Sequence, residues 1–380
     1  MPPSTFGEIM LGEKKQNKDI KKLAILAKQN INSRLNLKRT KSIYFEEKHY
    51  FALLLMISLF CVFAECGSYV VNWFGHLPKG DSLLDQLQKL KEEDVRGQFR
   101  KLFEWQFKNI FKFRMLKPKV VLAIDTTDKP TYSKKKKDDE NIVGGKKKAS
   151  TFYFFRFATI QIANKKNPVT LYVMHCNKET TNEQIVEKLV TQARKLVRIK
   201  CVLIDKGFYD TKVFNKLEEL NVKYLMPCKF NERTEKMFEK HLISNYEVKP
   251  YYCQNIKKEY ADFKLIMIKL SDETEIGYVT NMHFIKLHRA KYYIELYQKR
   301  WNIETGYRLQ NMFLAKTCSI NPSVRLFYFC YAVALHNLWV MIKSKVQNKS
   351  FHLPVLMFTL VLIIVVIIEF LDVNLLMGIT

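Results

Sequence analysis

Two short apolar runs that each end in an aspartate constrain the fold of this chain most strongly. The first occupies residues 119–125 and ends at Asp125, and the second occupies residues 201–205 and ends at Asp205. Each run is apolar at nearly every position, which is typical of a strand covered by other elements on both faces. The two runs therefore predict strands inside a mixed α/β layer.

The residues around these runs predict the rest of that layer. Aromatic and β-branched residues favour further strands, and a 3.6-residue apolar period after Thr180 favours a helix. In chain order we expect three strands, a helix, a strand, a second helix and a fifth strand. The fold class is thus α/β, with a mixed five-stranded sheet flanked by helices. The three additional strands are expected at 151–163, 168–175 and 223–226, and the second helix at 212–220.

The remaining segments predict further domains around this core. Residues 1–115 read as helices with interleaved basic residues, which favours a helical DNA-binding domain, although solvated helix faces explain the same pattern. Residues 229–285 break the α/β alternation and predict a β-rich insertion, and a long helix follows from about His288 to Met312. The insertion thus splits the core into two segments. The expected division is 1–115, 116–228 (first core segment), 229–285, 286–350 (second core segment) and 351–380 (an apolar C-terminal helix).

Two apolar stretches raise the question of a membrane. Residues 51–64 form a run of 14, which is shorter than the roughly 20 residues of a membrane span and fits a buried helix better. Residues 354–368 are more apolar, and we expect a core helix there, with membrane contact as the alternative.

The charge of the chain indicates a polyanionic partner. The 380 residues include 63 Lys and Arg against 37 Asp and Glu, a formal net charge of +26. Such a charge favours nucleic acid first and an anionic membrane surface second, and it disfavours an enzyme of small neutral metabolites. A lysine-rich loop is expected at 134–148, with a turn at Gly144 and Gly145, where DNA contact and simple solvation are equally good explanations. The eight cysteines have no zinc spacing and are expected to be reduced thiols in the cytoplasm.

Asp125 and Asp205 are the first candidate site residues. Ligand sites in α/β sheets gather at the carboxyl ends of strands, so both side chains are expected at one crevice. Aspartate also ends strands simply because it favours turns. Two carboxylates in a chain of charge +26 would repel a polyanion, unless a divalent cation such as Mg²⁺ lay between them and its phosphates.

A third group of residues lies on the predicted long helix. Tyr297, Arg300, Glu304 and Arg308 are spaced three or four residues apart, which predicts that they share one helical face. An ion pair within the helix, between Glu304 and Arg300 or Arg308, explains the same spacing without any function.

Three segments in this order resemble the DDE motifs of insertion-sequence transposases. They are AIDTTD (123–128), LIDKGFYD (203–210) and YQKRWNIETGYR (297–308). The last matches the signature Tyr-x₂-Arg-x₃-Glu of the superfamily named after insertion sequence 4, and the likeness covers residues 118–345. The resemblance implies a ribonuclease-H-like fold. The chain departs from it at Asn311, where the family often has lysine, and at Lys206, where it commonly has arginine.

Carried over by position, the resemblance assigns roles to seven residues. Asp125, Asp205 and Glu304 would be catalytic and would hold two Mg²⁺ ions, for which Mn²⁺ can substitute. Tyr297, Arg300, Arg308 and Lys206 would contact DNA.

The implied function is transposition of DNA. The protein would cleave transposon ends and join them to target DNA by metal-dependent phosphoryl transfer, by cut-and-paste. Its partners would be the terminal inverted repeats, target DNA and a second copy in a homodimer on paired ends, at the nucleoid in the cytoplasm, without membrane contact. A relative that binds DNA without cleaving it is the alternative. A membrane-associated protein is a third possibility, but it leaves the three motifs unexplained.

Overall fold

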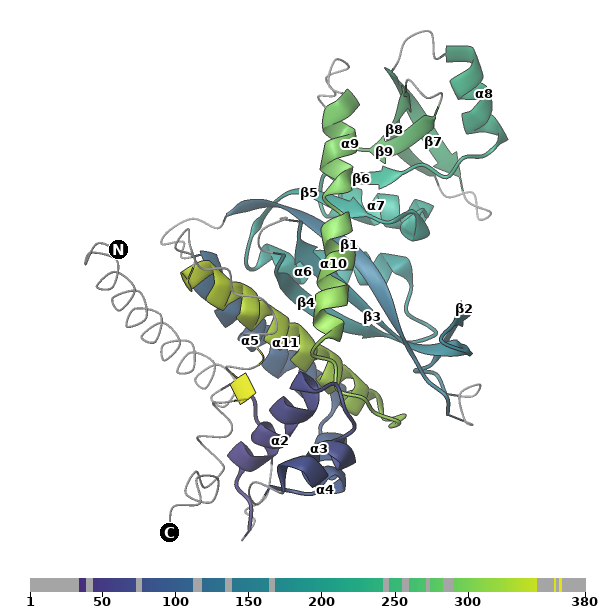
Figure 1. The fold of residues 1–380 in the computed structure, drawn as a ribbon. Helices are drawn as coiled ribbons and strands as arrows, with labels where there is room; N and C mark the ends of the chain where they lie inside the picture. Colours follow the sequence, from purple (N-terminus) through teal and green to yellow (C-terminus); the bar gives the residue numbers. More distant parts are fainter. Residues whose placement is uncertain are drawn as a thin grey trace, which may run out of the picture. The chain divides into compact units, whose positions relative to one another are not determined.

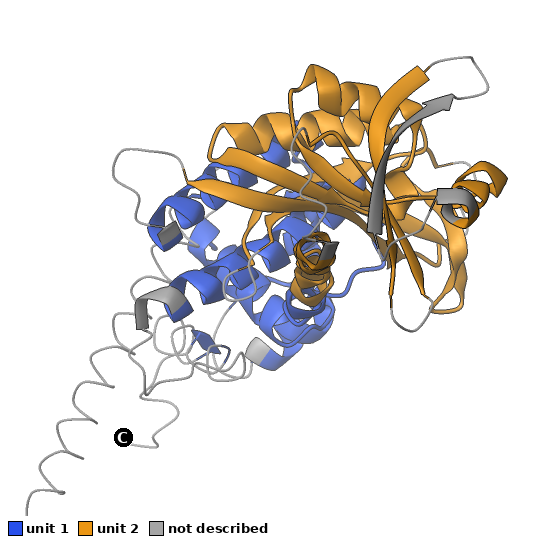
Figure 2. Ribbon diagram, turned by 90° about the horizontal axis from the view of Figure 1, so that it is seen from above, with its two compact units in different colours: residues 1–112, 308–380 blue, residues 113–307 orange. Residues whose placement is uncertain are grey.

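The computed structural model divides the chain into two compact units (Figure 2). Unit 1 comprises residues 1–112 and 308–380, and unit 2 comprises residues 113–307. The described residues are 34–38, 44–72, 77–111, 118–133, 139–163, 168–241, 246–254, 260–270, 274–282, 290–346, 359 and 362–363. Most of the apolar run 354–368, and with it the predicted C-terminal helix, lies outside these residues.

The described portion of unit 1 is helical, as its sequence predicts. The long helix α11 packs against α5 and α4, and the Phe99 and Phe327 rings meet edge to face with their centroids 5.0 Å apart. The side-chain amide of Gln106 donates to the buried carbonyl of Ala334 at 2.8 Å, which ties α5 to α11. The helices are α2 (Glu47–Leu59), α3 (Ala64–Val71), α4 (Gly80–Gln88), α5 (Glu92–Phe111) and α11 (Pro322–Val346).

The apolar stretch at 51–64 is a buried helix, as expected, only as far as Leu59, because Phe60 and Phe63 beyond it are exposed. Every residue of α2 from Tyr50 to Leu59 is buried. Within the described portion of the chain, one helical stretch, Pro322–Lys343, is long and apolar enough to cross a membrane, and 94% of its most apolar window is buried inside the protein. Burial of that kind is what a core helix shows, so this stretch of α11 is weak evidence for a membrane span.

Unit 2 is built on one mixed sheet (Figure 1). β1 pairs antiparallel with β3 and parallel with β5, and the strand order is β2-β3-β1-β5-β6-β9-β8-β7, with β4 on β3. The strands are β1 (Lys119–Pro130), β2 (Val143–Lys148), β3 (Thr151–Ile162), β4 (Thr170–Cys176), β5 (Arg198–Ile204), β6 (Tyr224–Pro227), β7 (Tyr246–Gln254), β8 (Tyr260–Lys269) and β9 (Glu275–Thr280).

The prediction of five strands was wrong, because the described residues form a nine-stranded sheet. The five expected strands are present, but the predicted insertion continues the same sheet. Its strand β9 pairs antiparallel with β6, with Leu225 opposite Thr280. The Thr280 hydroxyl donates to the carbonyl of Tyr224 at 2.6 Å, and Asn281 accepts from the Tyr224 N–H at 3.1 Å. The short strand β6 thus gains a partner on its free edge, which its own sequence does not indicate.

The predicted lysine loop at 134–148 is also corrected. Residues 143–148 form β2, and Gly144 lies within this strand opposite Tyr153. The turn comes later, at Ala149 and Ser150, whose φ angles are +47° and +62°. All residues of β2 after Val143 are exposed, so its lysines line an outer strand of the sheet, where charge hinders pairing with another chain.

Helices cover both faces of this sheet. Figure 1 shows α10 crossing in front of β1, while α6 lies behind the sheet, where it packs on β3, β4 and α7. Thr181 and Gln184 form the capping box of α6. The elements are α6 (Asn182–Arg194), the 3₁₀ turn η1 (Lys206–Phe208), α7 (Thr211–Glu219), α8 (Glu232–His241), α9 (Ala290–Gln298) and α10 (Trp301–Asn311).

Candidate active site

The parallel pairing of β1 and β5 places Asp125 and Asp205 side by side on neighbouring interior strands of the sheet. Ala123 lies opposite Leu203 and Ile124 opposite Ile204, so the two aspartates occupy the next positions of the register. The Asp125 carboxylate accepts from the N–H of Thr126 at 2.8 Å, and the Asp205 carboxylate accepts from the N–H of Gly207 at 3.2 Å, where it caps η1. Asp205 directly follows the last residue of β5, whereas β1 continues past Asp125 to Pro130, so the prediction that Asp125 ends its strand was wrong. Each carboxylate is held by the backbone N–H that follows it.

A single guanidinium group joins these aspartates to Glu304. Arg300 Nη1 lies 3.2 Å from Asp125 Oδ2, while Nη2 lies 3.5 Å from Asp205 Oδ1 and 2.9 Å from Glu304 Oε1. The Arg300 side chain is only 9% exposed, against 17% for Asp125 and about 40% for the other two acids. The intrahelical pair between Arg300 and Glu304 exists as expected, but it belongs to a larger four-residue cluster.

Arg300 reaches three acids because the predicted long helix is broken at this point. Helix α9 ends at Gln298 and α10 begins at Trp301. Between them, the N–H of Arg300 donates to the Tyr297 carbonyl at 2.8 Å, and the N–H of Ile303 donates to the Arg300 carbonyl at 2.8 Å. These three-residue spacings are typical of tight 3₁₀ turns. The expectation of one uninterrupted helical face was therefore wrong.

A buried hydrogen-bond chain attaches α10 to the strand that carries Asp125. The Tyr307 hydroxyl donates to the backbone carbonyl of Asp125 at 2.9 Å. Because that hydroxyl has a single hydrogen, the Thr159 hydroxyl donates to the Tyr307 oxygen, at 2.7 Å. The side-chain amide of Gln161 donates in turn to Thr159, at 3.4 Å. Thr159 lies directly opposite Asp125 in the sheet, so this series of hydrogen bonds fixes the first turns of α10 over β1 and β3.

Gly306 allows α10 to approach β3 closely enough for these hydrogen bonds to form. A β-carbon at Gly306 would lie 2.6 Å from Gln161 Oε1, much closer than normal contact allows. The sequence patterns did not indicate Gly306, Tyr307, Thr159 and Gln161 as site residues. A glycine in the middle of a helix costs about 1 kcal/mol relative to alanine, and that cost is the signal that could have identified Gly306.

Burial raises the pKa of the Asp125 carboxyl to about 6. The Arg300 guanidinium and the Thr126 N–H oppose this effect, and the charges of Asp205 and Glu304 add to it. The site therefore concentrates negative charge where water is largely excluded, and it relies on a nearby cation to keep that charge stable.

Comparison with protein families identifies this domain. The model described as "Transposase DDE domain" matches residues 116–338, which is more than half of the chain. The chain belongs to the transposase DDE domain family. No curated protein matches it. Among solved structures, one chain of a piggyBac transposase synaptic complex with hairpin DNA is similar, with 12% sequence identity, a TM-score of 0.50, and coverage of 92% of this chain and 77% of that one. At this identity the likeness concerns the fold alone, and it agrees with a mixed α/β transposase core.

The four residues predicted to contact DNA in this transposase domain differ in exposure. Lys206 is an exposed residue of η1, directly after Asp205, and Arg308 is an exposed residue of α10. Tyr297 is buried, with its hydroxyl 3.5 Å from the Ile204 carbonyl and its ring against Tyr278, and Arg300 is also buried. Lys206 and Arg308 are thus exposed, whereas Tyr297 and Arg300 are buried.

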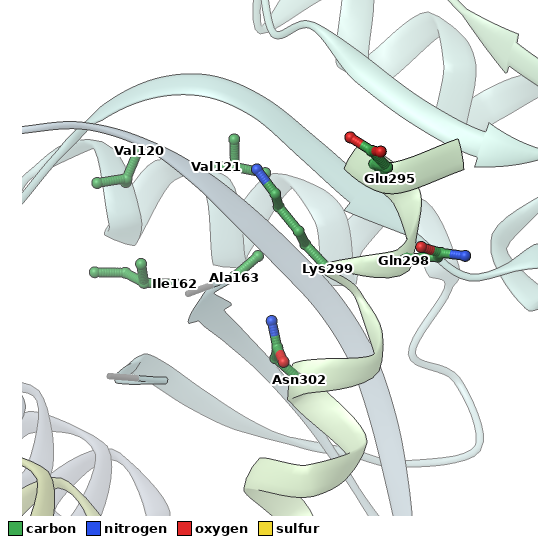
Figure 3. A pocket seen from close by; sticks show the side chains of 8 residues that line it. All are labelled: Val120, Val121, Ile162, Ala163, Glu295, Gln298, Lys299 and Asn302. Carbon is green, nitrogen blue, oxygen red and sulfur yellow. The ribbon is translucent and has the colours of Figure 1, made fainter. Parts of the chain in front are cut away.

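An open cleft of about 460 Å³ gives access to two of the three acids of this transposase domain. Asp125 and Asp205 line it, and the remaining lining is mainly polar. A larger cavity of about 670 Å³ lies elsewhere in unit 2, lined by the start of β1, the end of β3 and the α9–α10 junction (Figure 3). None of the three acids belongs to its described lining, so the smaller cleft is the candidate active site. The larger cavity is lined by Val120, Val121, Ile162, Ala163, Glu295, Gln298, Lys299 and Asn302.

The chemistry of the acids fits a hard divalent cation. Carboxylate oxygens are the ligands that Mg²⁺ prefers, and all three side chains lie within reach of one cationic group. In the described portion of the chain, no three His, Cys, Asp or Glu side chains lie close enough together to hold a metal ion directly. The acids gather around the Arg300 guanidinium, so a metal ion would have to enter the place that it occupies.

The Tyr307 hydroxyl is expected to stabilise the site. Tyr307→Phe removes both the donor to the Asp125 carbonyl and the acceptor of the buried Thr159 hydroxyl, which should lower the free energy of unfolding by about 1–3 kcal/mol. Tyr297→Phe is the matched control, because its hydroxyl donates to the Ile204 carbonyl over a longer distance of 3.5 Å, and the change should cost less than about 1 kcal/mol. Denaturant unfolding of both variants measures the difference, and equal losses would contradict the role of Tyr307.

The raised pKa of Asp125 predicts a pH-dependent effect of Asp125→Asn on stability. Between the ordinary value of 3.8 and about 6, the folded protein binds more protons at this group than the unfolded chain, so its stability falls as pH rises. The asparagine variant does not lose stability in this way, because its side chain does not ionise. Its free energy of unfolding relative to wild type should therefore rise with pH through this window, by about 3 kcal/mol, and level off above it. Urea unfolding in metal-free buffer at several pH values tests this, and a difference that is constant with pH would contradict it.

Proposed function

We propose that this protein is a DNA transposase that cleaves transposon ends and joins them to target DNA by metal-dependent phosphoryl transfer. The observation that carries the proposal is the cluster of Asp125, Asp205 and Glu304 around Arg300, within a transposase DDE domain. The three acids come from separate elements and meet beside an open cleft, as a site for a large substrate requires.

In this proposal the three carboxylates hold two Mg²⁺ ions, and Mn²⁺ can take their place. The ions would supply activation of the attacking water or DNA 3′-hydroxyl and stabilisation of the leaving oxygen. Asp125 and Asp205 provide rigid ligands, because the strand register and the Thr126 and Gly207 N–H groups fix their positions. Glu304 depends on the seating of α10, which Tyr307 and Gly306 secure.

The proposed partners are the terminal inverted repeats of a transposon and a target DNA. The net charge of +26 supports DNA binding, and the similar piggyBac structure is described as a synaptic complex with hairpin DNA. Lys206 and Arg308 would contact the DNA backbone from exposed positions, and Tyr297 and Arg300 would act nearer the acids. Residues 1–115, which are largely helical where the structure describes them, would form a DNA-binding domain. A homodimer on paired ends and a nucleoid location in the cytoplasm belong to the same proposal.

We assign the protein to the insertion-sequence-4 superfamily, with a ribonuclease-H-like core and a cut-and-paste reaction. The support is the signature Tyr297-x₂-Arg300-x₃-Glu304, in which Arg300 and Glu304 form a close ion pair and Tyr297 lies against the end of β5. The signature thus brings its arginine and its acid to the same end of the sheet as the two aspartates.

Asp205→Asn is expected to abolish cleavage while DNA binding is retained. Loss of one metal-binding carboxylate should slow Mg²⁺-dependent cleavage by at least roughly 100-fold. The assay uses linear DNA that carries the sequences flanking the coding region, with gel-shift binding measured in parallel. Asp210→Asn is the matched control, because Asp210 lies five residues later and caps α7 through the Lys212 N–H, at 2.8 Å, a role that asparagine fills equally well.

The outcomes separate the candidate functions. Equal cleavage by wild type and Asp205→Asn would contradict the assignment of Asp205. Binding without any cleavage by wild type would contradict the enzymatic proposal and favour a relative that only binds DNA.

A further inference from the structure

One guanidinium group occupies the centre of the acidic cluster. Arg300 Nη2 lies between two carboxylates, 3.5 Å from Asp205 and 2.9 Å from Glu304, and Nη1 lies 3.2 Å from Asp125. Arginine cannot lose its proton in proteins, so this charge is permanent. The cluster therefore already contains a cation before any metal ion arrives.

The burial of Arg300 shows that the ion pairs hold it in place. Its side chain is 9% exposed, and its Nε atom has no hydrogen-bond partner among the described residues. A buried guanidinium with an unsatisfied nitrogen is costly, and it persists only where opposite charges compensate for the lost water. Three carboxylates provide that compensation, and the arginine in turn offsets their mutual repulsion.

The same oxygens cannot serve the arginine and a metal ion at once. A Mg²⁺ ion binds carboxylate oxygens at about 2.1 Å, and an ion that bridges Asp205 and Glu304 would take the position of Nη2. Two positive charges at that separation would also repel each other.

We infer that Arg300 is the resident cation of the metal-free site and that divalent metal ions bind by displacing its guanidinium from between the carboxylates. This inference rests on the proposed function, which assigns the three acids as metal ligands. Arg300 reaches the acids through a long side chain, so rotation about its χ angles is enough to withdraw the guanidinium. Once released, the guanidinium is beside the cleft and free to bind a DNA phosphate, which couples metal binding to contact with the substrate.

The test is calorimetric titration of the full chain with Mn²⁺ in the absence of DNA. Arg300→Gln removes the competing charge and should tighten Mn²⁺ binding by at least roughly tenfold. Arg300→Lys keeps one charge but cannot pair with three carboxylates at once, so it should bind Mn²⁺ with an affinity between those of wild type and Arg300→Gln.

Arg156→Gln is the matched control. Arg156 lines the same cleft, but it is paired with Asp128, with Nε–Oδ1 and Nη2–Oδ2 distances of 2.7 and 3.1 Å. Its replacement removes the same charge without touching the three acids, and it should change Mn²⁺ affinity by less than about threefold.

The outcomes distinguish this inference from the proposed function. Weaker or unchanged Mn²⁺ binding by Arg300→Gln and Arg300→Lys would overturn the displacement of Arg300. A gain in affinity for Arg156→Gln equal to that for Arg300→Gln would overturn it too, because the effect would then be one of general charge. Asp205→Asn identifies the site: if it leaves Mn²⁺ binding intact, the ligand assignment itself fails.

Thermal unfolding keeps the test decisive if Arg300→Gln is unstable. The melting temperature of this variant should be lower than that of wild type without metal and should rise more than that of wild type when Mn²⁺ is added. If Arg300→Gln does not fold under either condition, Arg300→Lys decides the question through its Mn²⁺ affinity.

Discussion

Three carboxylates gathered at one end of a sheet repel each other, and the buried guanidinium of Arg300 offsets that repulsion. The other features of the site make this arrangement possible. The parallel register of β1 and β5 sets Asp125 beside Asp205, the break between α9 and α10 gives Arg300 its reach, and the Tyr307 hydroxyl fixes α10 over β1. The cluster is stable without metal only because its cation belongs to the chain itself.

The sequence predicted those features of this site that depend on local pattern. Apolar runs ending in acids predicted that Asp125 and Asp205 would lie together, because a covered strand has a recognisable composition, but they did not predict that β1 continues beyond Asp125 to Pro130. The spacing of Arg300 and Glu304 predicted their contact. The sequence did not reveal the pairing of Arg300 with the aspartates, since that contact joins residues 175 positions apart through a turn that no local pattern marks.

The errors in the predicted fold have the same physical origin. The edge of β6 is completed by β9 from the predicted insertion, and a strand's own residues do not tell which partner its edge will find. The run around Gly144 and Gly145 reads as a turn by composition, yet Gly145 lies in β2, where a β-carbon would be only 3.2 Å from the Phe154 ring. Glycine there allows close packing on the neighbouring strand instead of a reversal of the chain.

Membership in the transposase DDE domain family indicates the type of chemistry. The geometry adds a description of the metal-free site, in which Arg300 is paired with the three acids. With Arg300 bound to all three acids, the site is compact and poorly suited to phosphoryl transfer until a divalent ion takes the place of the guanidinium. A site of this kind would reach its reactive form only when metal ions and DNA are both bound, because the metal ions would pair with the carboxylates and a DNA phosphate would pair with the Arg300 guanidinium.

Anomalous diffraction from crystals of the protein with Mn²⁺ and a DNA end tests this account most directly. We expect anomalous peaks within coordination distance of Asp125, Asp205 and Glu304, with the Arg300 guanidinium moved away from the carboxylates and towards a phosphate. Peaks remote from the three acids, or Mn²⁺ bound to them while Arg300 keeps all three ion pairs, would contradict it.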